Sequence, residues 1–436
     1  MSWQDLYRSL VTTPEQAIEC VVPGSHVYIG GNAATPQILA EALAKRAISI
    51  FDPAGPPVTL AHVLWMGHDP AAEAVKLGAV RHRGFFVGSA DREAVANGTS
   101  DYVPVHLHQI PRLIREGLFK VDVALLQVSE PDPHGYMSLG VEILASKAAA
   151  AAARHVVVVV NEHMPRVLGD TFLHVSQVSA IIEDSRMLPE LPREEPTTVE
   201  KCIADHIAGL IPDGATLQLG IGGIPDAVIE RLKDRRHLGI HTEMMSDGVM
   251  YAALAGAIDG SRKNYHPGKA VITFAMGSQP LYEFLNNNPS VEALPSDVVN
   301  DPAIIARNDN LVAINSALAV DLTGQVCADS VGTRIYSGFG GQLDFIRGAA
   351  ASKGGIPVIA FPATARGGAV SRISPLLLLG SGVVTTRADV HTVVTEFGVA
   401  RLWGASLRER AERLIAIAAP QFREELLAAA RERTLV

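Results

Sequence analysis

The chain has 436 residues, of which 48% are hydrophobic and 19% charged, and its formal net charge is −9. This length indicates two or three domains with large buried cores, and the negative charge argues against bulk binding to nucleic acid or to an anionic membrane. The three cysteines (Cys20, Cys202 and Cys327) have no metal-ligand spacing and form no disulfide framework. No apolar signal core opens the chain and no apolar run spans a bilayer, so we expect a cytoplasmic protein without a metal site.

Two stretches, 22–43 and 212–232, show the same pattern of an apolar strand, a glycine turn, a proline and a helix. Identical residues also recur in one register along the two halves of the chain. Four pairs are 189 positions apart: Pro36 and Pro225, Leu43 and Leu232, Asp132 and Asp321, Gly135 and Gly324. Because separate segments share this spacing, we interpret it as an internal duplication.

Apolar runs of strand length alternate with helical patterns, which indicates mainly parallel sheets. We therefore predict an α/β fold of two similar α/β domains related by internal duplication. The predicted strands are 58–63, 83–86, 121–127 and 155–161 in the first half, and 217–219, 239–242, 270–274, 311–315, 356–360 and 393–395 in the second. The predicted domains are 1–188 and 199–436, the second ending in a helical tail at 404–432, with a proline-rich linker at 189–198.

A single carboxylate, Glu243, follows the predicted strand 239–242, about twenty residues after the glycine loop 220–224. Glycines let backbone N–H groups approach a ligand, and ligands of open α/β sheets bind at the carboxyl ends of strands. Glu243 is thus a candidate nucleophile or base, although a surface or helix-capping carboxylate gives the same pattern. His241 and Glu243 form H-x-E, but the P-C-x-x-C motif of zinc deaminases is absent from the sequence.

Two further stretches are candidates for ligand contacts. The first, 336–350, has three glycines within positions 338–341, whose N–H groups suit an oxyanion or a diphosphate, or simply form a tight turn. It does not match a dinucleotide-binding fingerprint. The second, 361–373, carries Arg366 and Arg372, which suit a phosphate-bearing ligand or belong to a solvated loop.

Taken together, these motifs resemble the acetyl-CoA hydrolase/transferase family, the class I coenzyme A transferases that include 4-hydroxybutyrate, butyrate and acetate CoA-transferases. The resemblance extends over nearly the whole chain. It rests on ten stretches: 104–113, 129–135, 164–170, 220–225, 241–248, 299–302, 315–318, 337–342, 370–373 and 394–400.

The resemblance implies a role for each matching position. Glu243 stands where the family has its nucleophilic glutamate, and Asn300 and the amide of Gly341 fall where oxyanion contacts are expected. The CoA contacts are implied at the glycine loop, at the backbone of Leu318, at Gly341 and at Arg366, which replaces a lysine of several relatives. The loop residues are Gly220, Ile221, Gly222, Gly223 and Ile224.

The function implied is transfer of CoA from a short-chain acyl-CoA to a carboxylate such as acetate. Glu243 would form a glutamyl-CoA thioester in covalent, ping-pong catalysis, with CoA as a substrate and no metal. Acyl-CoA and small carboxylic acids are the expected partners, and a homodimer is the expected assembly. Two alternatives stay open: a short-chain acyl-CoA hydrolase, in which water is the acceptor, and a non-catalytic CoA-binding module. The residues leave the acyl group and the acceptor acid open.

Overall fold

The computed structural model describes residues 2–436, which divide into two compact units. The N-terminal unit runs to Pro192 and also contains Val271–Val299. The C-terminal unit consists of Arg193–Ala270 and Asn300–Val436. Within residues 2–436, no helix has both the length and the apolar character needed to cross a membrane.

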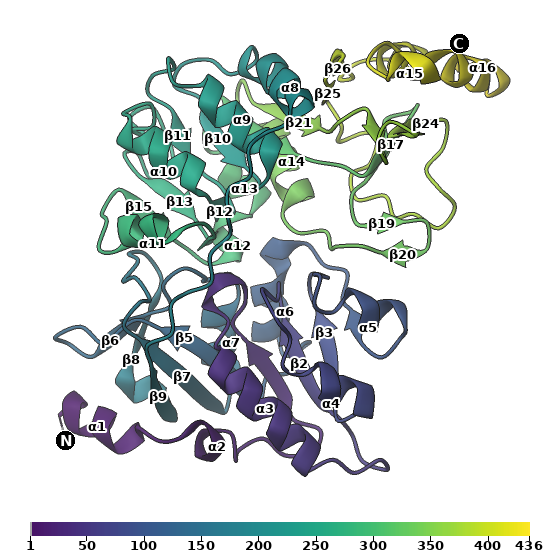
Figure 1. The fold of residues 1–436 in the computed structure, drawn as a ribbon. Helices are drawn as coiled ribbons and strands as arrows, with labels where there is room; N and C mark the ends of the chain where they lie inside the picture. The colour runs from purple at the N-terminus through teal and green to yellow at the C-terminus, as the bar shows by residue number, and fades with distance from the viewer. Residues whose placement is uncertain (1) are drawn as a thin grey trace. The chain divides into compact units, whose positions relative to one another are not determined.

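Seven parallel strands form the main sheet of the N-terminal unit (Figure 1). Residues 156–160 are all buried, as expected for a parallel strand covered on both faces. In spatial order the strands are β4 (Asp101–Tyr102), β3 (Val80–Gly84), β2 (Val58–His62), β1 (His26–Ile29), β5 (Val123–Val128), β7 (His155–Asn161) and β9 (Ala180–Asp184). The shorter strands are β6 (Tyr136–Ser138), β8 (Phe172–His174), β13 (Ala270–Ile272), β14 (Phe274–Ala275) and β15 (Val291–Ala293).

Helices α3 and α4 cover one face of this sheet (Figure 1). Leu39 and Leu43 of α3 belong to the same buried core cluster as Val27 and Leu60 of the sheet. The helices of this unit are α1 (Trp3–Leu10), α2 (Pro14–Ala17), α3 (Gln37–Ser49), α4 (Ala72–Leu77), α5 (Arg92–Ala96), α6 (Ile110–Arg115), α7 (Ser146–Ala152), α11 (Gln279–Leu285) and α12 (Ser296–Val299), with 3-10 turns η1 (Asn32–Ala34), η2 (Leu107–Gln109) and η3 (Val175–Gln177).

The C-terminal unit has a six-stranded sheet that is parallel except for its last pair. In spatial order its strands are β11 (Gly239–Ile240), β10 (Thr216–Leu219), β16 (Leu311–Asn315), β21 (Ile356–Ala360), β25 (Thr392–Thr395) and β26 (Gly398–Arg401). The shorter strands are β12 (Met244–Met245), β17 (Ala319–Asp321), β18 (Val326–Cys327), β19 (Ser330–Val331), β20 (Arg334–Ile335), β22 (Thr364–Ala365), β23 (Val370–Ser371) and β24 (Ile373–Ser374).

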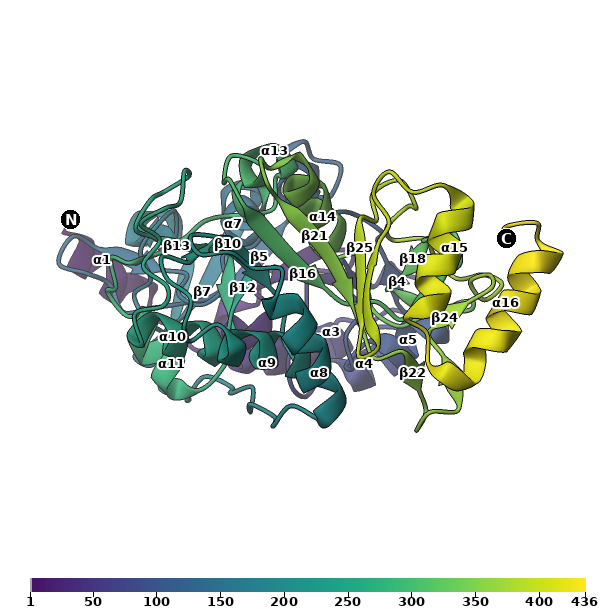
Figure 2. The same cartoon turned by 90° about the horizontal axis from the view of Figure 1, so that it is seen from above.

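Capping explains where several helices of this unit begin and end. The Thr197 hydroxyl accepts from the Glu200 N–H, and the Glu200 carboxylate accepts from the Thr197 N–H, so the pair caps the start of α8. The tail predicted at 404–432 is two helices, which Figure 2 shows side by side, because the 3-10 turn η4 (Pro420–Phe422) interrupts it. The helices are α8 (Thr198–Ala208), α9 (Gly223–Arg231), α10 (Asp247–Leu254), α13 (Pro302–Ile305), α14 (Gln342–Ala351), α15 (Leu407–Ala416) and α16 (Arg423–Glu432).

The two sheets repeat one strand order, which confirms the predicted duplication. The order β2-β1-β5-β7-β9 of the N-terminal unit matches β11-β10-β16-β21-β25 of the C-terminal unit. Equivalent positions follow from the strand pairing: Val27 pairs with Val123 and Leu60, and Leu217 pairs with Val312 and Ile240. Three residues beyond Leu60 and Ile240 lie Val63 and Glu243 respectively. The N-terminal unit therefore has a valine where the C-terminal unit has the candidate nucleophile.

One segment groups differently from the continuous domain boundary that we predict from the sequence. Val271–Val299 lies within the predicted C-terminal domain 199–436, yet its contacts group it with the N-terminal unit. The Tyr282 hydroxyl donates to the Pro189 carbonyl at 2.8 Å, and the Ser296 hydroxyl donates to the Leu107 carbonyl at 3.1 Å. Such long-range pairings leave no trace in local composition, from which the predicted boundary was drawn.

We predict that Gly169→Ala destabilises the N-terminal unit by about 3 kcal/mol. Gly169 has a φ of +126° and its backbone pairs with Ala293, so a Cβ there would overlap with the Ala293 backbone. Gly98→Ala is the matched control, because Gly98 has a φ of +74° but open space around a Cβ. The control should lose only about 1 kcal/mol from backbone strain. Urea unfolding of the full chain measures both losses, and equal losses would contradict the packing argument.

Candidate active site

Glu243 follows β11, and a side-chain bridge ties the preceding residue to the end of β10. The Thr242 hydroxyl accepts a hydrogen bond from the Leu219 N–H at 3.2 Å and donates to the Leu219 carbonyl at 3.0 Å. These two bonds extend the contact between β10 and β11 beyond the last backbone hydrogen bonds of the strand pair. The glycine loop, which starts at Gly220, therefore begins beside the residue that precedes Glu243.

Two hydrogen-bond donors hold the Glu243 carboxyl. The Asn300 Nδ2 atom donates to Glu243 Oε2 at 2.9 Å, and the Gly341 N–H also donates to this carboxyl. Gly341 is the N-cap of α14, so the positive end of the helix dipole lies at the carboxyl. A Cβ at position 341 would overlap with Glu243 Oε2 and Asn300 Nδ2, so only glycine fits. The structure thus brings together Glu243, Asn300 and Gly341, the three residues predicted to be catalytic.

Burial raises the pKa of Glu243 to about 7, from its usual value of 4.5. The hydrogen bonds from Asn300 and Gly341 oppose this shift, and the nearby carboxylate of Asp344 adds to it. A carboxylate has to be ionised to attack a thioester, and a polar surrounding favours the ionised form. The donors are present, but desolvation is the larger effect, so the pKa of Glu243 lies above that of a solvated carboxyl.

The glycine loop from Gly220 to Ile224 forms the turn between β10 and α9. Gly222 has a φ of +104°, which favours glycine. A Cβ on Gly223 would overlap with the Glu200 carboxylate that caps α8, so this position also needs a glycine. The loop therefore leads directly into the N-terminus of a nine-residue helix, an arrangement suited to a phosphate or an oxyanion.

The two remaining predicted CoA contacts are Leu318 and Arg366. Neither is among the groups that hydrogen-bond the Glu243 carboxyl. The Leu318 N–H donates to the Cys327 carbonyl at 2.8 Å, so a backbone contact from Leu318 to a ligand has to use its carbonyl oxygen. Arg366 is exposed in the turn between β22 and β23, with a φ of +52°.

One polar group that acts on Glu243 is absent from the sequence prediction. Asp344, in the first turn of α14, is 2% exposed and raises the pKa of Glu243. An acidic residue in a first turn commonly stabilises its own helix, so the sequence alone offers no signal for this second effect. Gln218 and Asn315, on neighbouring strands, form a 2.8 Å side-chain hydrogen bond. That pair becomes visible only when the strand register is known.

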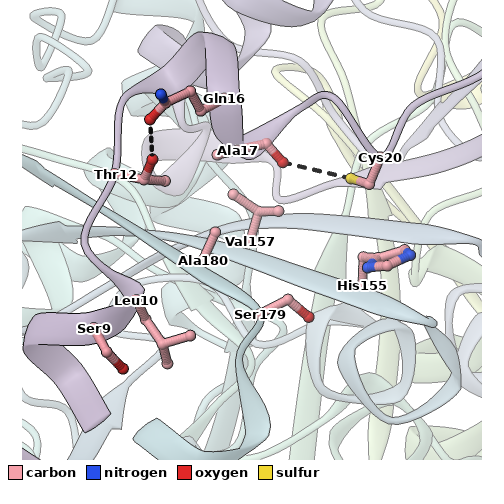
Figure 3. A pocket seen from close by; sticks show the side chains of 10 residues that line it. All are labelled: Ser9, Leu10, Thr12, Gln16, Ala17, Cys20, His155, Val157, Ser179 and Ala180. Carbon is pink, nitrogen blue, oxygen red and sulfur yellow. Dashed lines mark hydrogen bonds between the residues drawn. The ribbon is translucent and has the colours of Figure 1, made fainter. Parts of the chain in front are cut away.

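Within residues 2–436, no group of three or more His, Cys, Asp and Glu side chains is arranged to hold a metal ion. Buried His241 instead contacts the Asn308 side chain at 3.3 Å. Two pockets of about 750 and 290 Å³ lie in the N-terminal unit, and Figure 3 shows the smaller one beside Cys20. No predicted site residue lines either pocket.

Comparison with known proteins identifies the class and then the family. The models of the acetyl-CoA hydrolase/transferase N-terminal and C-terminal domains match residues 1–191 and 277–430. A relative from Clostridium kluyveri, named 4-hydroxybutyrate coenzyme A transferase, is 48% identical over 98% of each chain. A relative from Fasciola hepatica, named succinyl-CoA:acetate/propanoyl-CoA:succinate CoA transferase, is 44% identical over 95% of this chain and 86% of its own.

A solved structure also matches over nearly the whole chain. It is the 4-hydroxybutyrate CoA-transferase of Porphyromonas gingivalis, with a TM-score of 0.84, 41% identity and coverage of 99% of this chain and 100% of that one. These matches define an enzyme of the CoA-transferase class. The chain belongs to the acetyl-CoA hydrolase/transferase family, which confirms the predicted resemblance.

We predict that Glu243→Gln raises the free energy of unfolding above pH 7. The folded-state pKa of about 7 exceeds the usual 4.5, so the wild type loses stability as the pH rises between these values. The gain should disappear as the pH falls toward 4.5, where wild-type Glu243 is neutral in the folded protein. The midpoints of thermal unfolding of the variant and the wild type, compared from pH 5 to 8, measure this gain in stability.

The control for this experiment is Glu409→Gln. The Ser406 backbone N–H and hydroxyl bond Glu409 and hold its pKa below the usual value. This variant should therefore lose stability at pH 7, the opposite sign. A Glu243→Gln protein that is no more stable than the wild type at pH 8 would contradict the desolvation argument.

Proposed function

We propose that the chain is an acyl-CoA:carboxylate CoA-transferase that works through a covalent glutamyl-CoA thioester on Glu243. The observation that carries the proposal is one buried carboxyl held by two donors, Asn300 Nδ2 and the Gly341 N–H. A carboxylate stripped of water is a stronger nucleophile than a solvated one. The donor is a short-chain acyl-CoA and the acceptor is a small carboxylate such as acetate, in agreement with the names of the relatives.

The proposed reaction needs four nucleophilic substitutions. A carboxylate oxygen of Glu243 attacks the thioester carbonyl and expels the CoA thiolate, which leaves an acyl-glutamyl anhydride. The thiolate then attacks the glutamyl carbonyl, so the donor acid departs as a carboxylate and Glu243 becomes a thioester. The acceptor carboxylate attacks this thioester and expels the thiolate, and the thiolate takes the acyl group from the second anhydride. Glu243 returns as a carboxylate, and atoms and electrons balance without a redox step.

Each substitution places negative charge on a carbonyl oxygen. Asn300 Nδ2 and the Gly341 N–H are the donors that the C-terminal unit offers at this position. One well-placed donor of this kind is worth about 3 kcal/mol in the transition state. The glycine loop Gly220–Ile224, the Leu318 carbonyl and Arg366 are proposed to hold the CoA portion of the substrate.

Two observations favour transfer over the alternatives. The relatives that match at 48% and 44% identity are named as transferases, although the family description includes hydrolases, in which water would attack the same intermediates. A non-catalytic CoA-binding module has no need to bury a carboxyl whose pKa is raised to about 7. A homodimer in the cytoplasm remains the proposed setting.

We predict that incubation with acetyl-CoA or butyryl-CoA places CoA on Glu243. Borohydride then reduces the glutamyl thioester to an alcohol, and peptide mapping by mass spectrometry should localise the change to this residue. Activity should be lost in parallel, and Glu243→Gln should show neither labelling nor transfer. Steady thiol release without labelling would instead support the hydrolase, and the absence of both would leave the binding module.

We predict that Gly341→Ala lowers the transfer rate by 100-fold or more while the chain stays folded. The added Cβ displaces the Glu243 carboxyl and the Asn300 amide, which removes a donor from the developing oxyanion. Gly209→Ala is the matched control, because Gly209 has an ordinary φ of −65° and a Cβ there makes only normal contacts. Steady-state transfer from acetyl-CoA to propionate compares them, and equal rates would contradict the assigned role.

A further inference from the structure

The N–H group of Gly341 stands at the end of a loop that offers little restraint of its own. Gly338, Gly340 and Gly341 leave three of four consecutive positions without a side chain, and Gly340 has a φ of +53°. Gly341 is the N-cap of α14, but it has no side chain with which to cap the helix. Neighbouring residues therefore have to fix the position of its N–H.

Gln342, the first residue of α14, binds two other segments of the C-terminal unit through its side-chain amide. Its Nε2 atom donates to the Ser316 carbonyl, and its Oε1 atom accepts from the Thr385 hydroxyl at 3.1 Å. Ser316 follows β16, and Thr385 is fully buried in the segment before β25. Both ends of the amide are thus used, one as a donor and the other as an acceptor.

These two segments are also joined to each other, so the contacts form a closed ring through Gln342. The backbones of Thr385 and Val326 exchange two hydrogen bonds, at 3.0 and 3.3 Å. Val326 opens β18, and the carbonyl of the next residue in that strand accepts from the Leu318 N–H at 2.8 Å. Leu318 lies two residues after Ser316. One side chain therefore ties the start of α14 to the segment that carries the proposed CoA contact.

We propose that Gln342 is a positioning residue that sets the Gly341 N–H against the reacting carbonyl. It acts by fixing the first turn of α14 on the Ser316 and Thr385 segments, while the N–H itself contacts Glu243. The inference rests on the proposed transfer reaction, in which this N–H stabilises each oxyanion. A displacement of about 1 Å can cost about 100-fold in rate, so the donor has to be held in place as well as present.

The first test removes the two bonds of the Gln342 amide. Gln342→Leu keeps a side chain of similar size but loses both bonds, so kcat for transfer from acetyl-CoA to propionate should fall about tenfold or more, while the KM for propionate changes less than about threefold. Thr385→Val removes one bond and should cost less, and the double variant should be no slower than Gln342→Leu alone, because both changes break the same ring. Each rate is divided by the fraction of Glu243 that acetyl-CoA and borohydride finally label, so unfolded protein does not affect it.

Gln342→Glu adds a readout that depends on pH. The ionised carboxylate still accepts from the Thr385 hydroxyl but repels the Ser316 carbonyl, whereas the protonated carboxyl donates to that carbonyl as the amide does. The kcat of this variant relative to the wild type should therefore rise as the pH falls from 8 to 5, and the same ratio for Gln342→Leu should not rise. Gln421→Glu, at an exposed position of η4, is the matched control and should follow the wild type throughout.

The titration of Glu243 tests the same contact without turnover. The Gly341 N–H opposes the rise in the pKa of Glu243, so its displacement in Gln342→Leu should raise that pKa further, by roughly half a pH unit or more. Carbon-13 NMR of the full chain labelled at its glutamate carboxyls measures this change, and Glu243→Gln assigns the signal.

The two readouts separate the role of Gln342 from the reaction on which it rests. If wild-type Glu243 is labelled but Gln342→Leu keeps either the wild-type kcat or the wild-type pKa of Glu243, the role of Gln342 is wrong and the transfer reaction stands. If no label forms on the wild type, the proposed function fails. The titration then decides by itself whether Gln342 positions the Gly341 N–H, because an unchanged pKa overturns that role and a raised one supports it.

Discussion

The desolvation of one carboxyl group is the constraint around which the C-terminal unit is organised. Glu243 is held where its pKa rises to about 7, and only Asn300 and the Gly341 N–H oppose that rise. Three chain segments must meet for this: the end of β11, the segment before α13 and the start of α14. The absence of a side chain at 341 is as necessary as the presence of one at 243, because any Cβ there would overlap with both polar partners.

Internal duplication supplied two copies of the same scaffold, and the copies have diverged at the equivalent loops. Val63 is 4% exposed at the position equivalent to Glu243, so the N-terminal copy keeps the strand but lacks the proposed nucleophile. The loops at the ends of parallel strands lie outside the hydrogen-bonded core. Their sequences can therefore diverge without disturbing the strands.

Sequence reasoning works well here for features that are local or repeated. The strands 311–315 and 356–360 have the predicted bounds, and the 189-residue spacing leads to the repeated strand order. The three predicted catalytic residues come together because the motifs that carry them are specific as a set. Sequence reasoning works less well for three features. They are the grouping of Val271–Val299 with the N-terminal unit, the effect of Asp344 on the pKa of Glu243, and the buried Asn32 side chain, whose two polar atoms have no hydrogen-bond partner. Each of these depends on which distant groups a residue meets, and no periodicity or composition records that.

The raised pKa of Glu243 also bears on the energetics of the proposed intermediate. Burial destabilises the ionised carboxyl relative to water by roughly 3 kcal/mol, given a shift from 4.5 to about 7. Forming a glutamyl thioester consumes this destabilised carboxylate and releases a small acid whose carboxylate is fully solvated. In the proposed reaction this exchange favours the covalent intermediate, which would hold CoA until an acceptor carboxylate arrives. The same burial would slow hydrolysis of the proposed thioester, because a site that strips water from a carboxylate also limits the water that can attack its thioester.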